Sequence, residues 1–134
     1  MKLLLDTHLA LWLMSGDEKL TEETKALIQH PDNEVYYSIV SVWEISIKNS
    51  IHPDKMLVSG KEFSDILERS KVRFLPLRKA HVFELRSLRR REGAKEHRDP
   101  FDRMLLCQAK SEGMTLLTHD QMMIDYEEDC LICV

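Results

Sequence analysis

Five acidic side chains stand where secondary-structure elements are expected to begin or end, and these are the groups that could do chemistry. Asp6 follows the apolar residues 3–5, and Asp120 follows the strand-like residues 115–118. An acid after a strand is more often a turn former or a helix cap than a ligand, so each is weak evidence alone. Both together are informative, because ligands of parallel α/β folds bind beyond the carboxyl ends of the strands.

Glu44 lies on an expected helix rather than after a strand. At about 100° per residue it projects close to Val40 and Ile51, at the edge of the helix's apolar face. A carboxylate in that place persists only if it is paired, protonated or bound to a cation. Lys48 stands one turn further on, so an ordinary salt bridge explains Glu44 as well as a metal does.

Asp102 shares the core-facing stripe of another expected helix with Leu105, Leu106 and Ala109. It falls in the first turn, where the helix N-terminus favours negative charge. Asp99 stands three residues earlier and points nearly the same way. For this pair alone, a helix cap at Asp99 and a dipole-stabilising acid at Asp102 are the simpler explanation.

A metal centre would explain the five acids together. If the fold brings them to one place, their like charges would force protonation unless a cation is present. Oxygen ligands with few neutral partners suit Mg²⁺ or Mn²⁺. The implied chemistry is hydrolysis of a phosphodiester, in which one or two ions activate a water and neutralise charge on the leaving oxygen.

The elements that must position these acids alternate between strand and helix. Strands are expected at residues 2–5, 35–38, 72–75, 115–118 and 131–134. Helices are expected at residues 7–14, 21–30, 40–50, 59–69, 79–90 and 99–112. Parallel strands need crossover connections, which are usually helical. The sequence therefore predicts an α/β fold with a central parallel sheet of four or five strands flanked by helices.

Local signals define several helix ends and buried faces. Thr21 and Asp99 are expected N-caps, and Ser59 with Glu62 has the form of a capping box. Gly113 is expected to end the last helix. Trp12 and Trp43 are expected in the core rather than at a base-stacking surface, and Val82, Leu85 and Leu88 are expected to face inward.

The length of 134 residues fits one domain, residues 1–134. No apolar run approaches the ~20 residues of a membrane span, and Asp6 interrupts what would be a signal peptide's apolar stretch. Cys107, Cys130 and Cys133 are an odd number, typical of reduced thiols in a cytoplasmic protein. A role for the CxxC at residues 130–133 stays open.

The charge of the chain is unevenly distributed. Nineteen basic and 23 acidic residues give a net charge of −4, which by itself argues against a nucleic-acid partner. Residues 86–103, however, hold seven bases against four acids, whereas residues 120–129 hold five acids and no base. Within the basic segment His97, Arg98 and Arg103 could contact the phosphates of a nucleic acid or belong to an ordinary solvated face.

Four segments, in this order, resemble a PIN-domain ribonuclease: LLLDTH (3–8), SVWEISIK (41–48), HRDPFDRMLLCQA (97–109) and LLTHD (116–120). They look most like VapC-type toxins of bacterial toxin–antitoxin pairs, in the branch that carries a DPFDR motif. The match covers essentially the whole chain. It implies a three-layer, Rossmann-like PIN fold and a Mg²⁺- or Mn²⁺-dependent endoribonuclease that cuts single-stranded RNA.

The resemblance also assigns individual residues. The implied metal ligands are Asp6, Glu44, Asp102 and Asp120, with Asp99 as an additional catalytic acid and Thr7 and Thr118 supporting the site through their hydroxyls. An oxygen-rich Mg²⁺ site needs no histidine, so no direct role is expected of the histidines beside these acids.

Partners are implied by the same resemblance. The apolar residues of the first two helices, with the helix that begins near Ser59, would form the groove for an antitoxin peptide and a homodimer surface. The charged residues 89–96 and the acid-rich residues 125–129 depart from relatives of this branch, so the electrostatics around the site are left open.

Other functions fit the sequence less well. A response-regulator receiver would need paired acids after the first strand and a lysine near Leu131, and an aspartyl phosphatase would need an acid where His8 stands. The remaining alternative is a catalytically silent PIN-like module that only binds a protein. Such a module has no physical reason to keep several repelling carboxylates together.

Overall fold

All five strands lie in one parallel sheet, in the order β3-β2-β1-β4-β5. The computed structural model describes residues 1–134. The strands are β1 Lys2–Leu5, β2 Glu34–Ser38, β3 Arg73–Leu75, β4 Thr115–Thr118 and β5 Leu131–Cys133. Leu5 of the central strand β1 pairs with Leu117 of β4, so the two strands end side by side. The predicted parallel α/β sheet is confirmed.

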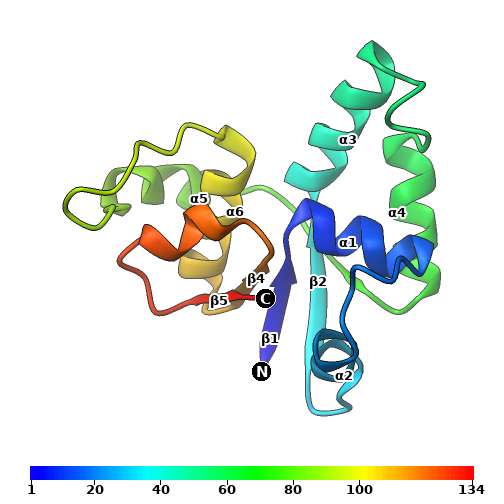
Figure 1. Ribbon diagram of the computed structural model, residues 1–134, viewed down its shortest axis with the longest axis horizontal. Helices are drawn as coiled ribbons and strands as arrows, with labels where there is room; N and C mark the ends of the chain where they lie inside the picture. The colour runs from blue at the N-terminus through cyan, green and yellow to red at the C-terminus, as the bar shows by residue number, and fades with distance from the viewer.

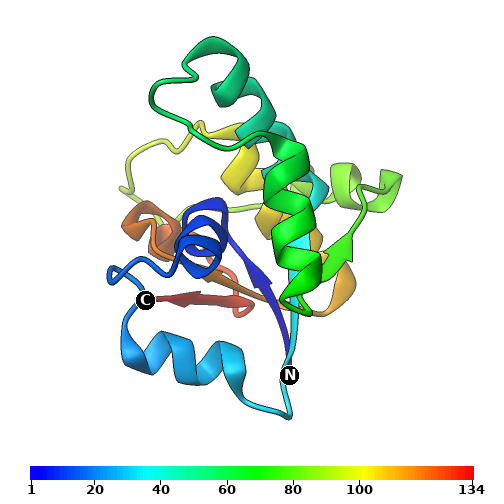
Figure 2. The ribbon, with the colours of Figure 1, turned by 90° about the vertical axis from the view of Figure 1, so that its right-hand side faces the viewer.

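Helices cover both faces of the sheet and give three layers (Figures 1 and 2). They are α1 Thr7–Ser15, α2 Glu22–Gln29, α3 Ile39–Ile51, α4 Gly60–Arg69, α5 Lys79–Phe83 and α6 Pro100–Glu112, with the short 3₁₀ helices η1 Glu84–Ser87 and η2 Gln121–Asp125. In Figure 2, α1, α2 and α4 lie in front of the strands. Because side chains alternate along a strand, Leu3 and Leu5 join the core under these helices, whereas Leu4 joins the core under α6.

Several helices begin or end at the predicted signals. Thr21 caps α2, and Ser59 and Glu62 form both hydrogen bonds of the capping box that opens α4. Gly113 ends α6 in the left-handed conformation, with φ at 67°. Asp99 caps α6, and this cap places Asp102 in the first turn of the helix.

The helix predicted over residues 79–90 is wrong in length and in orientation. It consists of the short α5 and η1, and Val82 is 41% exposed instead of inward, whereas Leu85 and Leu88 are partly buried and Leu88 packs against the core. The buried side chain of α5 is His81, whose imidazole Nε2 lies 2.8 Å from an Oε1 of Glu112. Residues 89–91 leave the helix because their backbone bonds with residues 125–127: the Glu127 N–H donates to the Arg89 carbonyl.

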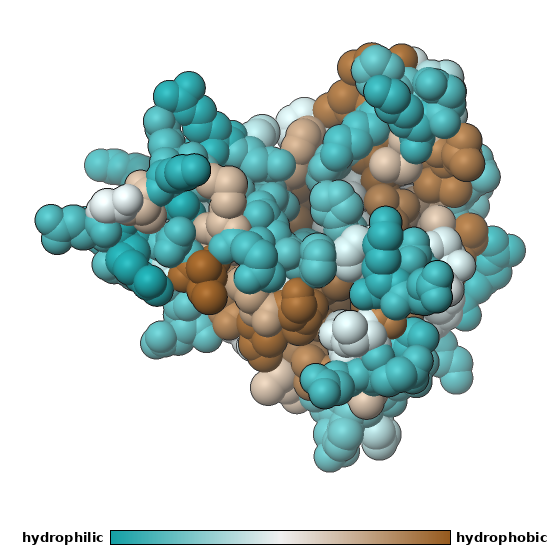
Figure 3. Space-filling view, in the orientation of Figure 1, coloured by the Kyte–Doolittle hydropathy of each residue, from teal (hydrophilic) through white to brown (hydrophobic).

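The buried face of α3 also differs from the prediction. Its buried side chains are Val40, Ser41, Glu44 and Ile45. Trp43 is therefore 58% exposed and Ile51 62% exposed, and the expectation of Trp43 in the core is wrong. Figure 3 shows hydrophobic surface over the far end of α3 and the loop after it. Sequence periodicity found an apolar stripe, but only its first residue, Val40, lies in the core, whereas Trp43 and Ile51 face solvent.

The three cysteines are free thiols. Burial raises the pKa of Cys107 to about 11, so this thiol stays protonated and is a poor nucleophile. Burial also raises the pKa of Cys130 and of Cys133. No helix of the structure combines the length and apolar character that a membrane crossing requires.

Candidate metal centre

The carboxyl ends of β1 and β4 bring Asp6 and Asp120 to one edge of the sheet. The first turns of α1, α3 and α6 lie around the same edge (Figure 1). Parallel neighbours end on the same side, so two acids that are 114 positions apart in the chain become neighbours in space. The third contribution comes from the start of α6, which carries Asp99 and Asp102.

Asp6 is buried, 2% exposed, and is fully hydrogen-bonded by neutral donors. Its Oδ1 accepts the Leu9 N–H at 2.8 Å, which caps α1. Its Oδ2 accepts the Thr118 hydroxyl at 2.7 Å and the His119 N–H at 2.8 Å. The carboxylate is thus held in one orientation by three donors from two elements, without a basic partner.

Asp120 is linked to Asp6 through Thr118. The Thr118 hydroxyl, which donates to Asp6, also accepts the Asp120 N–H at 3.1 Å. The Oδ1 of Asp120 accepts the Met122 N–H at 2.9 Å and thereby caps η2. Its Oδ2 is free of hydrogen bonds to the backbone and points toward His97, 3.4 Å from the imidazole Nε2.

Asp102 carries the clearest electrostatic signal in the cluster. Burial raises its pKa to about 8, and the negative charge of Asp99, a hydrogen bond with Asp120 and the charges of Asp6 and Asp120 act in the same direction. The Asp99 carboxylate caps α6 by accepting the N–H groups of Phe101 and Asp102. Asp99 is therefore both the N-cap of α6 and a member of the acidic cluster.

Glu44 lies beside this cluster but is already paired. It is 4% exposed; its Oε1 accepts the Thr7 hydroxyl at 2.7 Å, and its Oε2 lies 2.6 Å from the Lys48 ammonium. The salt bridge considered in the sequence is present. The charges that raise the Asp102 pKa are those of the other three aspartates, Asp99, Asp6 and Asp120, and do not include Glu44. The fold thus groups four acids and holds the fifth beside them through Thr7, the residue after Asp6.

His97 is the site residue whose position sequence reasoning missed. It is 7% exposed, whereas contact with RNA phosphate requires an accessible side chain. Its Nδ1 lies 2.9 Å from the Tyr126 hydroxyl, and its Nε2 lies 3.7 Å from Oδ2 of Asp102. The sequence showed only that His97 lies two residues before the helix cap Asp99. Nothing in the sequence predicted its contact with Tyr126, which is 29 positions away.

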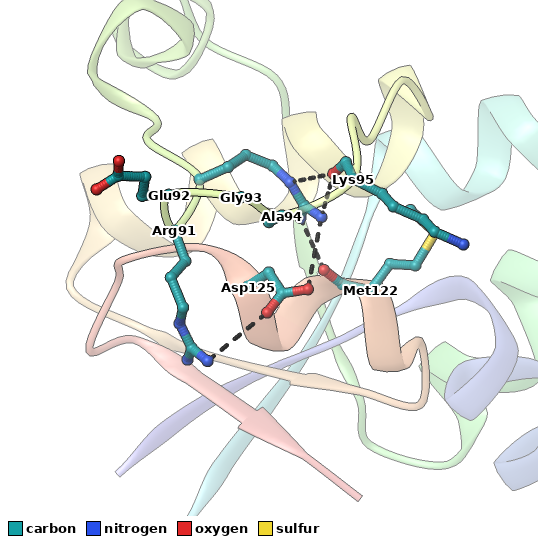
Figure 4. Close-up of a pocket in the computed structure, with 8 residues that line it drawn as sticks. Arg91, Glu92, Gly93, Ala94, Lys95, Met122 and Asp125 are labelled. Atoms are coloured by element: carbon teal, nitrogen blue, oxygen red, sulfur yellow. Dashed lines mark hydrogen bonds and ion pairs between the residues drawn. The ribbon is translucent and has the colours of Figure 1, made fainter.

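The other basic residues of the 86–103 segment divide into two groups. The Arg98 side chain is 82% exposed and pairs with Glu96, and Arg103 is partly buried. Arg90 is mostly buried and binds the carbonyls of Lys95 and Met122. A surface pocket of about 420 Å³ lies under residues 90–95, and Figure 4 shows Arg91 and Asp125 paired within it. None of the five acids lines this pocket.

The cluster has the chemistry of a divalent cation site. No lysine or arginine forms an ion pair with any of its four aspartates, and the one ring that faces them is His97. One nitrogen or oxygen atom each of His97, Asp102 and Asp120 lie within 4.8 Å of one another. Burial and the neighbouring aspartates disfavour the charged form of Asp102, and a bound cation would offset this cost. The donor set of carboxylate oxygens fits Mg²⁺ or Mn²⁺.

The comparison with protein families identifies the class. Residues 3–129 match the PIN domain model, and the chain belongs to the PIN domain family. No curated protein sequence matches the chain.

Solved structures with the same fold come from toxin–antitoxin complexes. VapBC2 of Rickettsia felis, bound to promoter DNA, is 18% identical with a TM-score of 0.67, over 100% of this chain and 98% of that one. DNA-bound VapBC of Salmonella typhimurium is 14% identical with a TM-score of 0.65, over 99% and 98%. VapBC-1 of Haemophilus influenzae is 17% identical with a TM-score of 0.60, over 93% and 94%. At these identities the likeness shows the fold.

Proposed function

We propose that the chain is one PIN domain over residues 1–134 that acts as a Mg²⁺- or Mn²⁺-dependent endoribonuclease. We further propose that it is a VapC-type toxin of the branch that carries the DPFDR motif. The observation that carries the proposal is the group of four aspartates at one sheet edge, which has no basic partner. Within it, burial and the other three carboxylates raise the pKa of Asp102 to about 8. Such a cluster is costly to keep unless it binds a cation.

Some residues of the chain would bind the cation, and others would hold those ligands in position. Asp6, Asp102, Asp120 and Glu44 are the proposed ligands, with Asp99 as an additional catalytic acid. Asp6 needs no movement, because Thr118 and the α1 backbone already hold it. Asp102 must release a proton before it binds. When bound, the cation would supply activation of a water and neutralisation of phosphate charge.

The substrate is proposed to be single-stranded RNA. Exposed Arg98 and partly buried Arg103 flank the start of α6, where Asp99 and Asp102 lie. Positive side chains beside a cation site attract a phosphate backbone whatever the net charge of the protein. His97 is not part of this surface, because it is buried.

The proposed protein partners are an antitoxin and a second copy of the chain. The structural neighbours were crystallised as toxin–antitoxin complexes, which supports this assignment for a chain with the same fold. The apolar residues 11–14 of α1 are only partly buried, and Trp43, Ile51 and Leu57 are exposed by 58%, 62% and 78%. These side chains would be covered in a complex.

The decisive experiment is cleavage of single-stranded RNA by purified protein with Mg²⁺, with Mn²⁺ and with EDTA. Wild type is expected to cleave only with metal, and Asp6→Asn combined with Asp102→Asn is expected to be inactive. Asp65→Asn is the matched control, because Asp65 is a surface acid on α4 that pairs with Lys61. Equal cleavage by the double variant would overturn the assignment, and a wild type without cleavage that still binds an antitoxin would indicate a silent binding module.

A further inference from the structure

We propose that His97 is itself a ligand of the cation, through its imidazole Nε2. The centre would then present nitrogen as well as oxygen and favour a transition-metal ion such as Mn²⁺ over Mg²⁺. This inference rests on the proposed metal site, but it concerns a residue outside the four ligands that the resemblance implies. It also reverses the expectation that no histidine acts in the centre.

The first observation is burial without a partner. The His97 side chain is 4% exposed, and Nε2 is the one buried side-chain nitrogen or oxygen in the protein that has no hydrogen bond. Buried polar atoms are nearly always paired, so an orphaned one calls for a physical explanation. A cation held between Nε2 and the carboxylates provides one.

The second observation is the spacing of the atoms around Nε2. The Oδ2 atoms of Asp120 and Asp102 lie 3.4 and 3.7 Å from it. Both separations exceed the 2.7–3.2 Å of an ordinary N–H···O hydrogen bond. Two ligands that are each about 2.1 Å from one ion lie roughly 3.0 to 3.4 Å apart, depending on the angle between them. The separation from Asp120 falls at the upper end of this range and the separation from Asp102 lies slightly beyond it, so a small inward movement of Asp102 would complete the spacing of three neighbouring ligands.

The third observation is the support behind the ring. The His97 Nδ1 lies 2.9 Å from the Tyr126 hydroxyl. The Arg90 guanidinium stacks 4.8 Å from the centre of the Tyr126 ring and is itself fixed by the carbonyls of Lys95 and Met122. Figure 4 shows Met122 and residues 91–95, which line the adjacent surface pocket. A hydrogen bond to the second ring nitrogen is the usual way in which a metal-binding histidine is oriented.

The rival role for His97 is that of a positioning residue. In that role a proton on Nε2 would donate to Asp120 or Asp102 and hold the carboxylates, while the cation would be bound by oxygen alone. The two roles differ in a directly measurable way, because only a ligand places nitrogen in the coordination sphere of the metal.

The test is pulsed electron paramagnetic resonance of Mn²⁺ bound to the full chain. Wild type is expected to show nitrogen-14 modulation, which His97→Gln loses and which His119→Gln and His8→Gln retain. Both control histidines are exposed and adjoin the same acids. Bound Mn²⁺ without nitrogen modulation in wild type would overturn the inference and leave the proposed function intact, whereas no Mn²⁺ binding at all would overturn both.

Affinity provides the second measurement. Calorimetry is expected to show Mn²⁺ binding weakened by at least about tenfold in His97→Gln, and Mg²⁺ binding weakened less. Glutamine keeps an amide donor close to the place of Nε2, so a purely positioning role predicts unchanged Mn²⁺ affinity, which would overturn the inference. The wild-type spectrum needs no variant and remains decisive if His97→Gln fails to fold.

Discussion

The two sides of the metal centre differ in how completely the protein itself satisfies them. On the sheet side, the Asp6 carboxylate receives three hydrogen bonds from α1, β4 and the residue after β4. On the α6 side, Asp102 has a pKa raised to about 8, and the Nε2 of His97 has no partner. The sheet side is therefore organised before any ligand binds, whereas the α6 side has no positive charge to balance its carboxylates. The same residue type, aspartate, therefore plays two parts: Asp6 is held in place by hydrogen bonds, whereas Asp102 lies buried beside other acids without a compensating charge.

The largest expected effect is on catalysis. Asp102→Asn removes a proposed ligand from the deficient side and should lower RNA cleavage on the order of 10³-fold, while preserving the shape of the side chain. Single-turnover cleavage in Mn²⁺ measures the loss, with Asp65→Asn as control. Cleavage within a fewfold of wild type would remove Asp102 from the centre.

Metal affinity is expected to depend on pH because Asp102 must lose its proton to bind. With a pKa of about 8, the apparent affinity for Mn²⁺ should rise by up to about tenfold per pH unit between pH 6 and 8 and level off above. Calorimetric titrations at pH 6.5 and 7.5 test this rise. Equal Mn²⁺ affinities at these two pH values would contradict the difference between Asp6 and Asp102.

Stability without metal is expected to change in opposite directions on the two sides. Asp6→Asn should lower the free energy of unfolding by about 1–2 kcal/mol, because it disturbs a helix cap and satisfied hydrogen bonds. Asp102→Asn should raise it at pH 7.5, because it removes a buried acid that is costly to ionise. Urea unfolding in EDTA measures both, and a shift of the same sign in both variants would contradict this contrast.

The same contrast predicts the pH dependence of stability. The ordinary pKa of an aspartate is 3.8 and that of folded Asp102 is about 8, so between these values the folded state holds a proton that the unfolded state has lost. The contribution of this group to stability therefore falls as pH rises through that window, by up to about 1.4 kcal/mol per unit. Unfolding between pH 5 and 7.5 should show a weaker decline in Asp102→Asn than in wild type.

The smallest expected effect concerns Lys48. The Lys48→Met variant would leave buried Glu44 with the Thr7 hydroxyl alone and should cost about 1 kcal/mol of stability in EDTA. If Glu44 is a ligand, the same change should strengthen Mn²⁺ binding severalfold, since the cation no longer competes with an ammonium group. Weaker Mn²⁺ binding in this variant would instead mean that Lys48 supports the site by holding the Glu44 carboxylate in place.

Local chemistry made much of the fold predictable. The strands at 2–5 and 115–118 were recognised from short apolar runs, and the start of α6 was recognised from Asp99 and Pro100. The prediction failed where a distant partner decided the outcome. Residues 89–91 leave the helical path to pair with residues 125–127. Trp43 faces outward because the helix face with Ser41 and Glu44 meets Thr7.

The sequence by itself determined the strand and helix order, the positions of the acids at element ends and, through the resemblance, the PIN assignment. Those features follow from periodicity and capping, which act over a few residues. Only the tertiary structure decided that Glu44 also bonds to Thr7, that Asp102 holds its proton to about pH 8, and that His97 turns inward onto Tyr126. Burial and the proximity of distant charges set these properties, and neither quantity exists until the chain has folded.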